Sequence, residues 1–373
     1  MTITSSAASR TGRAATVAGV VPAAVEAVPA HTVGAESPWV LVCEFRALEP
    51  LWGEAALIGG EQIALFRLPD ARVFAVSNAD PATGAFVMSR GIVGSKGDRP
   101  TIASPLHKDI FDLETGFCFT STTLSLPTWR VRIAGGTVEV ARRPVLVASS
   151  HGTSDPAGQR AIAGLVQAVR DARPELVVVD SFVDVQEPDV VTAVSALGAR
   201  DAAIFVPLLL SAGYHVHVDL ADAAAGATQP VAIAGALGPD RRLASVLARR
   251  LHEAGLQEGD RVVLAAAGSS NRSSVDDCHE MGRLLTVELR RPVTVSFLSA
   301  AEPRVAEAVA TARADHAGAR VVVASYLLAP GYFAALAAEA GADATSGPLL
   351  RDDEDPPAEL VDIVCELYES VLL

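Results

Sequence analysis

Two histidines stand at positions where the sequence could place chemistry. His151 ends the apolar run of "LVASSHGTSDP" (residues 146–156), and His215 lies in "FVPLLLSAGYHV" (residues 205–216). A neutral imidazole binds divalent first-row metal ions, and because it titrates near neutral pH it can also accept a proton. The pair therefore predicts a site that handles a metal ion, a proton or both.

Both histidines belong to the first copy of an internal repeat and are absent from the second copy. "VLVASSHGTSD" aligns with "VLAAAGSSN", and "FVPLLLSAGYHV" aligns with "VASYLLAPGYFA" at a nearly constant offset. In this alignment His151 meets Ala267 and His215 meets Phe333. A packing role would be needed in both copies, whereas a site that is needed only once explains histidines in one copy alone.

The elements that would position the histidines are those of a parallel α/β sheet. From residue 144 onward, apolar runs such as "VLVASS", "LVVVDSFV" and "AAIFVPLLL" alternate with Ala-rich stretches of helical period. Such strands indicate a parallel sheet that is covered on both faces, with roughly four strands in each copy. In the flavodoxin-like strand order 2-1-3-4, the first and third strands are neighbours at the switch point. Their carboxyl ends would bring His151 and His215 to one cleft.

The same motifs resemble a known enzyme family. "SSHGTSDP", "FVDVQEP" and "FVPLLLSAGYHVHVD" are similar to the sirohydrochlorin chelatases of the CbiX type in a two-lobed form, flavodoxin-like and of chelatase class II. The resemblance implies a lyase that inserts Fe²⁺ or Co²⁺ into the anionic tetrapyrrole sirohydrochlorin, with the metal as substrate and no permanently bound cofactor. It makes His151 and His215 the catalytic and metal-binding histidines, and it adds Asp184 of "FVDVQ", where many members carry a glutamate.

Further residues of these motifs are candidates for substrate binding. Hydroxyls and backbone N–H groups near a helix start could receive substrate carboxylates. The alternative is a Ser/Thr/Asp cluster that only caps the helix. The Gly-Tyr pair before His215 recurs in the second copy, which favours a backbone or packing role. The candidates are Ser150, Thr153, Ser154, Gly213 and Tyr214.

Residues 38–140 predict a different, all-β domain of short strands with turn signals between them. "FAVSNADPATGA" and "SPLHKDIFDLETG" resemble the two boxes of a Rieske domain, in which Cys-x-His and Cys-x-x-His hold a two-iron cluster. Here Asp80 and Ala82 stand at the first box, and Ser104 replaces the second cysteine, which leaves His107 alone. We therefore expect no iron–sulfur cluster.

This clusterless pattern, together with "SRGIVGSKGDRPTIASPL", resembles the small subunit of NAD(P)H-dependent assimilatory nitrite reductase. The resemblance implies a place in nitrate assimilation, with the large subunit of the sirohaem nitrite reductase as a partner. Because sirohaem is the iron complex of sirohydrochlorin, the fusion favours Fe²⁺ insertion for sirohaem, a branch of porphyrin biosynthesis. Two alternatives stay open: cobalt insertion toward cobalamin, and a non-catalytic nitrite reductase small subunit whose α/β half delivers a cofactor.

These patterns divide the chain into four segments. They are a flexible leader at 1–37, the Rieske-like domain at 38–140, a first chelatase lobe with the active-site histidines at 144–256, and a degenerate second lobe at 257–373.

Charge and cysteine content exclude several classes of protein. The formal net charge is −14, and because acidic and basic residues balance over residues 1–143, the acidic excess lies in the later part. An acidic surface argues against binding to nucleic acid or to a membrane surface. The four cysteines lie far apart without a C-x-x-C pair, which indicates a reducing compartment, and we expect a cytoplasmic protein.

Overall fold

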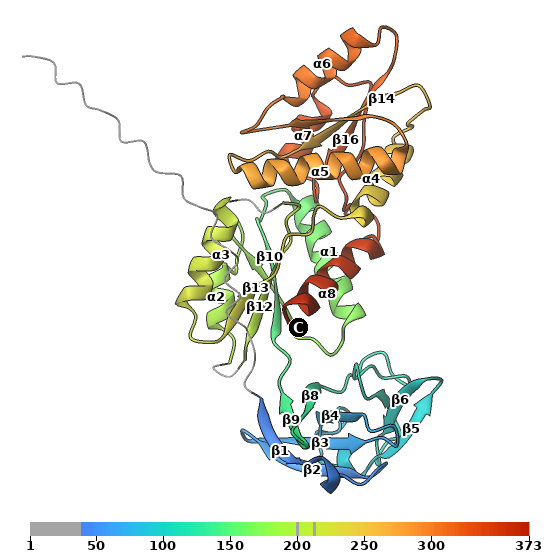
Figure 1. The fold of residues 1–373 in the computed structure, drawn as a ribbon, viewed down its shortest axis with the longest axis vertical. Helices are drawn as coiled ribbons and strands as arrows, with labels where there is room; N and C mark the ends of the chain where they lie inside the picture. Colours follow the sequence, from blue (N-terminus) through green and yellow to red (C-terminus); the bar gives the residue numbers. More distant parts are fainter. Residues whose placement is uncertain (1–38, 199–200, 212–213, 373) are drawn as a thin grey trace, which may run out of the picture. The chain divides into compact units, whose positions relative to one another are not determined.

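The computed structural model describes residues 39–198, 201–211 and 214–372, and the side chains of 214–217 lie outside the described set. An antiparallel β domain is followed by an α/β region with two parallel sheets (Figure 1). The fold class predicted from the sequence is therefore confirmed. The predicted leader lies outside the described residues.

The front domain consists of two antiparallel sheets. Strand β3 is central because its side chains alternate between two cores: Ile63 and Leu65 pack in one, and Ala64 and Phe66 in the other. The larger sheet has the order β1-β9-β8-β4-β3-β2 and the smaller one β5-β6-β7. The elements are β1 (Val40–Glu44), η1 (Phe45–Ala47), β2 (Gly53–Ile58), β3 (Glu61–Arg67), β4 (Val73–Ser77), η2 (Met88–Arg90), β5 (Ile92–Lys96), β6 (Arg99–Ala103), β7 (Ile110–Asp112), β8 (Thr128–Ala134) and β9 (Thr137–Ala141).

The α/β region repeats one parallel sheet twice. The first lobe has the order β11-β10-β12-β13 and the second β15-β14-β16-β17, so both follow the predicted order 2-1-3-4. The strands are β10 (Val145–Ser150), β11 (Val178–Phe182), β12 (Ala203–Pro207), β13 (Val231–Ile233), β14 (Arg261–Ala266), β15 (Val293–Phe297), β16 (Val321–Tyr326) and β17 (Ala344–Thr345).

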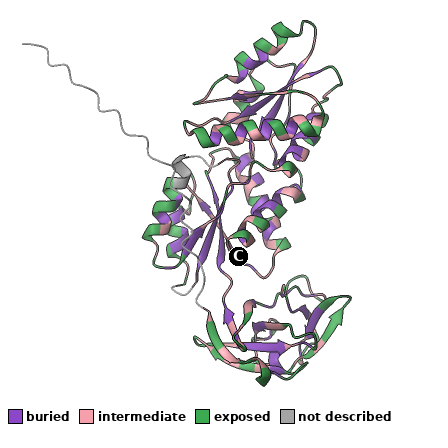
Figure 2. Cartoon of the chain, viewed as in Figure 1, coloured by how far each residue is buried: buried purple, intermediate pink, exposed green. Residues whose placement is uncertain are grey.

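Helices cover both faces of each sheet, as the apolar strands predict. Strand β10 shows why: Leu146 and Ala148 face one core, whereas Val145 and Val147 face another. Strands β10, β12 and β16 are accordingly buried throughout, whereas β11, β15 and β17 at the sheet edges are partly exposed (Figure 2). The helices are α1 (Pro156–Ala172), α2 (Val190–Ser195), α3 (Tyr214–Gly226), α4 (Arg241–Glu253), α5 (Arg272–Leu289), α6 (Val305–Asp315), α7 (Tyr332–Ala338) and α8 (Ala358–Leu372).

The two lobes exchange their last helices. Helix α4 follows the first lobe in sequence but packs on α5 and β16, while α8 follows the second lobe and packs on α1 and β12 (Figure 1). As a result, one continuous hydrophobic core contains residues of both sheets. The segment between Leu349 and Glu359 makes the crossing, and each lobe therefore depends on the other for burial of one sheet face.

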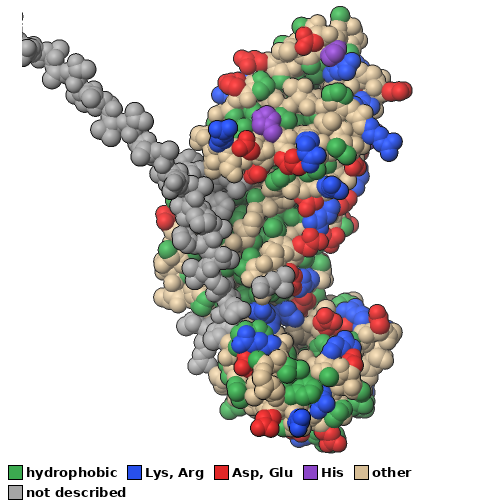
Figure 3. Space-filling view, in the orientation of Figure 1, with side chains coloured by type: hydrophobic (Ala, Val, Ile, Leu, Met, Phe, Trp, Pro, Cys, Tyr) green, Lys and Arg blue, Asp and Glu red, His purple; other side chains and the backbone are tan. Residues whose placement is uncertain are grey.

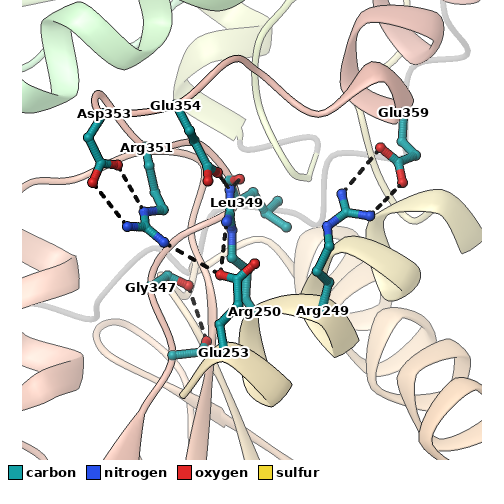
Figure 4. A network of polar contacts seen from close by, with 10 residues as sticks. Arg249, Arg250, Glu253, Gly347, Leu349, Arg351, Asp353, Glu354 and Glu359 are labelled. Carbon is teal, nitrogen blue, oxygen red and sulfur yellow. Dashed lines mark hydrogen bonds and ion pairs between the residues drawn. The ribbon is translucent and has the colours of Figure 1, made fainter. Parts of the chain in front are cut away.

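Arginines of α4 hold the crossing segment. Arg250, whose side chain is 2% exposed, donates to the carbonyl of Leu349 at 2.9 Å and pairs with Glu253 and Glu354. Its neighbour Arg249 pairs with Glu359 in the first turn of α8 at 3.0 Å (Figure 4). A buried guanidinium needs partners for its donors, and these contacts pair both terminal nitrogens of Arg250, whereas its Nε has no partner among the described residues.

Charged side chains of both signs are interspersed on the molecular surface seen in Figure 3. Exposed pairs such as Arg283–Glu280, at 2.5 Å, are of the kind that contributes little to stability. Among the described residues, no helix combines the length and the apolar character needed to cross a bilayer.

Candidate functional site

A cleft of about 690 Å³ lies at the carboxyl ends of the parallel strands and is lined by both lobes. The first lobe contributes the loops after β10, β11 and β12, and the second lobe the corresponding loops after β14, β15 and β16. Its volume suits a ligand of cofactor size, and its place is the switch point where open α/β sheets bind ligands.

His151 stands at the end of β10, where it lines the cleft with an exposed side chain. Its carbonyl accepts the N–H of Asp184 at 3.0 Å, which ties it to the loop after β11. Strand β10 pairs directly with β12, and the residues from Leu208 to Ser211 after β12 also line the cleft. His215 is the second residue of α3, and its side chain is outside the described set. Gly213 and the side chain of Tyr214 are also outside that set.

Gly152 allows the tight turn that follows His151. Its φ is +90°, and a Cβ there would lie 2.0 Å from the carbonyl oxygen of Asp184. Gly268 in the second lobe has a φ of +91°, and a Cβ there would lie 1.9 Å from the carbonyl oxygen of Ser299. Only glycine fits this backbone, and the aligned glycines therefore mark one loop design that is used twice.

Ser150 is a buried polar residue with an unusual environment. The residue is 4% exposed and lines the cleft, yet its Oγ has no hydrogen-bond partner among the described residues. Its neighbour Ser149 is satisfied, because its Oγ lies 2.9 Å from Ser181 Oγ. The second lobe has Ala266 where the first has Ser150. A buried hydroxyl without a partner is costly, so its retention points to a ligand.

The helix-capping interpretation holds for part of the Ser/Thr/Asp cluster. Asp155 caps α1 by accepting the N–H two residues on, at 2.8 Å, and Thr153 Oγ1 accepts the N–H of Asp155 at 3.1 Å. The second lobe repeats both contacts, with Asn271 and Ser269. Ser154 lines the cleft with an exposed side chain. The role of Thr153 and Ser154 toward a substrate stays a prediction.

The loop after β11 places different residues in the cleft than the sequence suggested. Val185 and Gln186 line it, whereas Asp184 is exposed beside it, with its Oδ1 accepting the N–H of Val185 at 2.8 Å. Val185 has a φ of +67°, a strained value for a β-branched residue and one often found near functional sites. The catalytic role of Asp184 stays a prediction.

Gln186 is a site residue that the sequence reasoning missed. Its Oε1 accepts the N–H of Thr153 at 2.9 Å, which fixes the loop that follows His151. Aligning "FVDVQEP" with "FLSAAEP" of the second lobe would have placed Ala301 opposite Gln186 and shown that this amide occurs in the first lobe only.

The cleft is electrically almost neutral. None of the described residues that line it is Lys, Arg, Asp or Glu. Burial raises the pKa of the Cys278 thiol to about 12, with a smaller contribution from Asp277, and burial raises the pKa of the Tyr326 phenol well above its usual value. Both groups stay protonated near neutral pH. The described residues also contain no group of three or more His, Cys, Asp or Glu side chains suited to hold a metal.

A hydrogen bond joins the two lobes at the base of the cleft. The buried phenol of Tyr326, at the end of β16, donates to the carbonyl of Leu210 at 2.8 Å. Leu210 belongs to the cleft-lining residues that follow β12. The second lobe therefore fixes the position of a loop of the first.

In the front domain, the two box loops are joined by side chains that differ from the Cys and His ligands of a two-iron cluster. Asp80 and Ser104 are buried and hydrogen-bonded to each other, and Asp80 Oδ1 also accepts the N–H groups of Ala82 and Thr83 at 3.0 Å. Burial raises the pKa of Asp80, but the hydrogen bonds from Ser104 and Thr83 outweigh it and lower the pKa. Ala82 offers no ligand atom, so these residues do not fit a two-iron cluster. His107 is exposed.

The fold and site together define an α/β protein with two similar lobes around one ligand cleft, joined to a Rieske-like domain. The CbiX family model matches residues 145–254 and 261–338, so the chain belongs to the CbiX family. A second model, described as a Rieske-like [2Fe-2S] domain, matches residues 38–141.

Individual relatives agree with this division. The small subunit of nitrite reductase (NADH) from Salmonella typhimurium is 37% identical over 105 residues, which is 28% of this chain and 97% of that subunit. The large subunit of nitrite reductase [NAD(P)H] from Klebsiella oxytoca is 35% identical over 109 residues, 29% of this chain but only 11% of that protein. SirB from Bacillus subtilis, solved with Fe³⁺, shares the fold with a TM-score of 0.52 at 20% identity, covering 61% of this chain and 95% of SirB.

Proposed function

We propose that the α/β region is a sirohydrochlorin chelatase that inserts a divalent metal ion, with Fe²⁺ as the physiological metal. Membership in the CbiX family and a cleft of cofactor size support a tetrapyrrole substrate. The observation that carries the proposal is the placement of His151 in the cleft at the end of β10, where the second lobe has Ala267. The scaffold is duplicated, and the imidazole is not.

The reaction replaces two pyrrole N–H protons with one divalent ion, so charge balances when two protons leave. His151 has an exposed imidazole that can accept one of these protons or bind the incoming ion. His215 is proposed as the second histidine. Asp184 is proposed as a nearby carboxylate whose negative charge favours the protonated, cationic form of an imidazole. A site with few ligands suits an ion that must move on, because a closed cage would retain it.

The described residues of the cleft lining include no Lys or Arg that could pair with substrate carboxylates. We assign this role to the hydroxyls and backbone N–H groups at the start of α1 and at the first-lobe loops. The residues concerned are Ser150, Thr153, Ser154, Gly213 and Tyr214.

The front domain favours iron over cobalt. Its relatives include small subunits of nitrite reductase, and an enzyme that needs sirohaem gives iron insertion a direct use. We propose the large subunit of such a reductase as its partner. The competing function is a small subunit without chelatase activity, in which the α/β region delivers a finished cofactor.

One experiment separates these functions. The purified full chain is mixed anaerobically with sirohydrochlorin and either Fe²⁺ or Co²⁺, and the absorption spectrum is followed against the rate without protein. A protein-dependent rate supports the chelatase, and the ratio of the two rates reports the metal preference. Binding of sirohydrochlorin or sirohaem with no acceleration by either metal supports the delivery function instead.

A further inference from the structure

The second lobe contributes two adjacent aromatic residues to the cleft lining. Tyr332, in the first turn of α7, is 74% exposed although it is a large aromatic residue, and it lines the cleft together with Phe333. The two rings lie 5.6 Å apart between centroids at an interplanar angle of 57°. In the repeat, Phe333 stands where the first lobe has His215. The same position is therefore polar in one lobe and apolar in the other.

The aromatic pair lies beside the loop that follows His151. A Cβ on Gly331 would be 3.5 Å from Thr153 Oγ1, and the carbonyl oxygen of Pro330 would be 2.4 Å from a Cβ on Gly158 of α1. The backbone just before Tyr332 therefore packs against the first lobe at the start of α1. This contact brings the ring of Tyr332 and the imidazole-bearing loop to the same cleft.

The lack of charged side chains among the described lining residues limits which interactions can bind a tetrapyrrole in the cleft. None of the described lining residues is Lys or Arg, so these residues offer a polyanionic ligand no permanent cation to pair with. A planar macrocycle offers two large apolar faces, and aromatic rings stack on such faces in offset or edge geometry. Without ion pairs to the described lining residues, contact with the apolar faces of the macrocycle is the main source of binding free energy.

We propose that the second lobe is the binding wall for the tetrapyrrole ring, with Tyr332 in contact with one face of the macrocycle and Phe333 supporting it. This inference rests on the chelatase function proposed above. It assigns the lobe that lacks the two aligned histidines a task of its own: it holds the ring, while the first lobe supplies the groups that meet the metal and the protons.

The test measures binding of metal-free sirohydrochlorin to the full chain by its absorption change, separately from metal insertion. Tyr332→Ala should raise the Kd roughly 3- to 10-fold, whereas Tyr332→Phe, which keeps the ring, should stay within about twofold. The control is Val287→Ala on α5, a comparably exposed apolar residue (66%) outside the cleft lining, which should leave the Kd unchanged. In steady-state assays the loss in Tyr332→Ala should appear in KM and spare kcat.

Salt provides a second readout that needs no variant. Because the described lining residues include no Lys or Arg, the Kd should not rise by more than about twofold between about 0.05 and about 0.5 M NaCl. An unchanged Kd in Tyr332→Ala, or a Kd that rises steeply with salt, overturns the inference while the chelatase function stands. A wild-type chain that neither binds sirohydrochlorin nor accelerates insertion overturns the proposed function itself.

Discussion

Replacing Ser150 with alanine should lower activity without lowering stability. The Ser150 hydroxyl is buried and unpaired among the described residues, and a buried unsatisfied group costs about 1–3 kcal/mol. The aligned Ala266 is buried at the same point of the second sheet, which shows that alanine packs there. We therefore expect the free energy of unfolding of Ser150→Ala to stay constant or to rise by up to about 1 kcal/mol.

The expected loss of activity in Ser150→Ala comes from a hydrogen bond that the substrate can no longer make. If the bound substrate, or a water that it holds, pairs with this hydroxyl, its removal costs about 0.5–1.5 kcal/mol of binding free energy, which corresponds to a 2- to 12-fold fall in kcat/KM. Ser149→Ala is the matched control, because Ser149 is buried on the same strand, is paired with Ser181 and is not among the cleft-lining residues.

The control variant Ser149→Ala should lose stability and keep its activity. Ser149→Ala loses a hydrogen bond and leaves Ser181 unpaired, so its free energy of unfolding should fall by about 1 kcal/mol while kcat/KM stays close to wild type. Denaturant unfolding followed by circular dichroism and initial rates of Co²⁺ insertion measure both quantities. A Ser150→Ala protein that is destabilised by 1 kcal/mol or more with an unchanged kcat/KM would refute the reasoning.

Two further predictions concern proton-linked behaviour. Asp80→Asn should destabilise the front domain by roughly 1–3 kcal/mol at neutral pH; because the pKa of Asp80 is lowered in the folded state, its contribution is present above pH ~4 and lost as pH falls through the folded pKa. Fluorescence of the three tryptophans, all in this domain, reports it, and an identical acid profile in the variant would contradict it. Protons and divalent metal ions compete for imidazole nitrogens, so the rate of metal insertion should fall on the acid side, and raising the Co²⁺ concentration should shift this acid limb to lower pH. A limb that stays fixed from far below to far above saturating Co²⁺ would speak against metal–proton competition.

Local patterns were sufficient to predict the architecture. Strands such as β10 are apolar on both faces, and this burial on both sides is what a covered parallel sheet requires. The internal repeat predicted that both sheets share one strand order, and the aligned Gly152 and Gly268 indeed have the same φ within 1°. The exchange of α4 and α8 was not predictable, because a helix shows its apolar face in sequence but not the sheet that will cover it.

The site was predictable where a residue type carries its own chemistry. His151 drew attention because imidazole is rare and reactive, and the structure places it in the cleft. Gln186 carries no such signal, because its role rests on a hydrogen bond to Thr153. The sequence named Ser150 only as one hydroxyl of a cluster, and the burial of its unpaired Oγ is what singles it out. Both depend on distances between loops that sequence spacing does not contain.

The most direct test of the account compares initial rates of metal insertion in the wild type and in His151→Ala, measured at saturating Co²⁺ and sirohydrochlorin. The second lobe carries Ala267 at the equivalent place, and His151 is exposed, so the variant should fold with an unchanged free energy of unfolding. Loss of a group that transfers protons or delivers the metal should lower the rate about 100-fold or more. A variant that inserts metal at the wild-type rate would contradict the assignment of this cleft as the chelatase site.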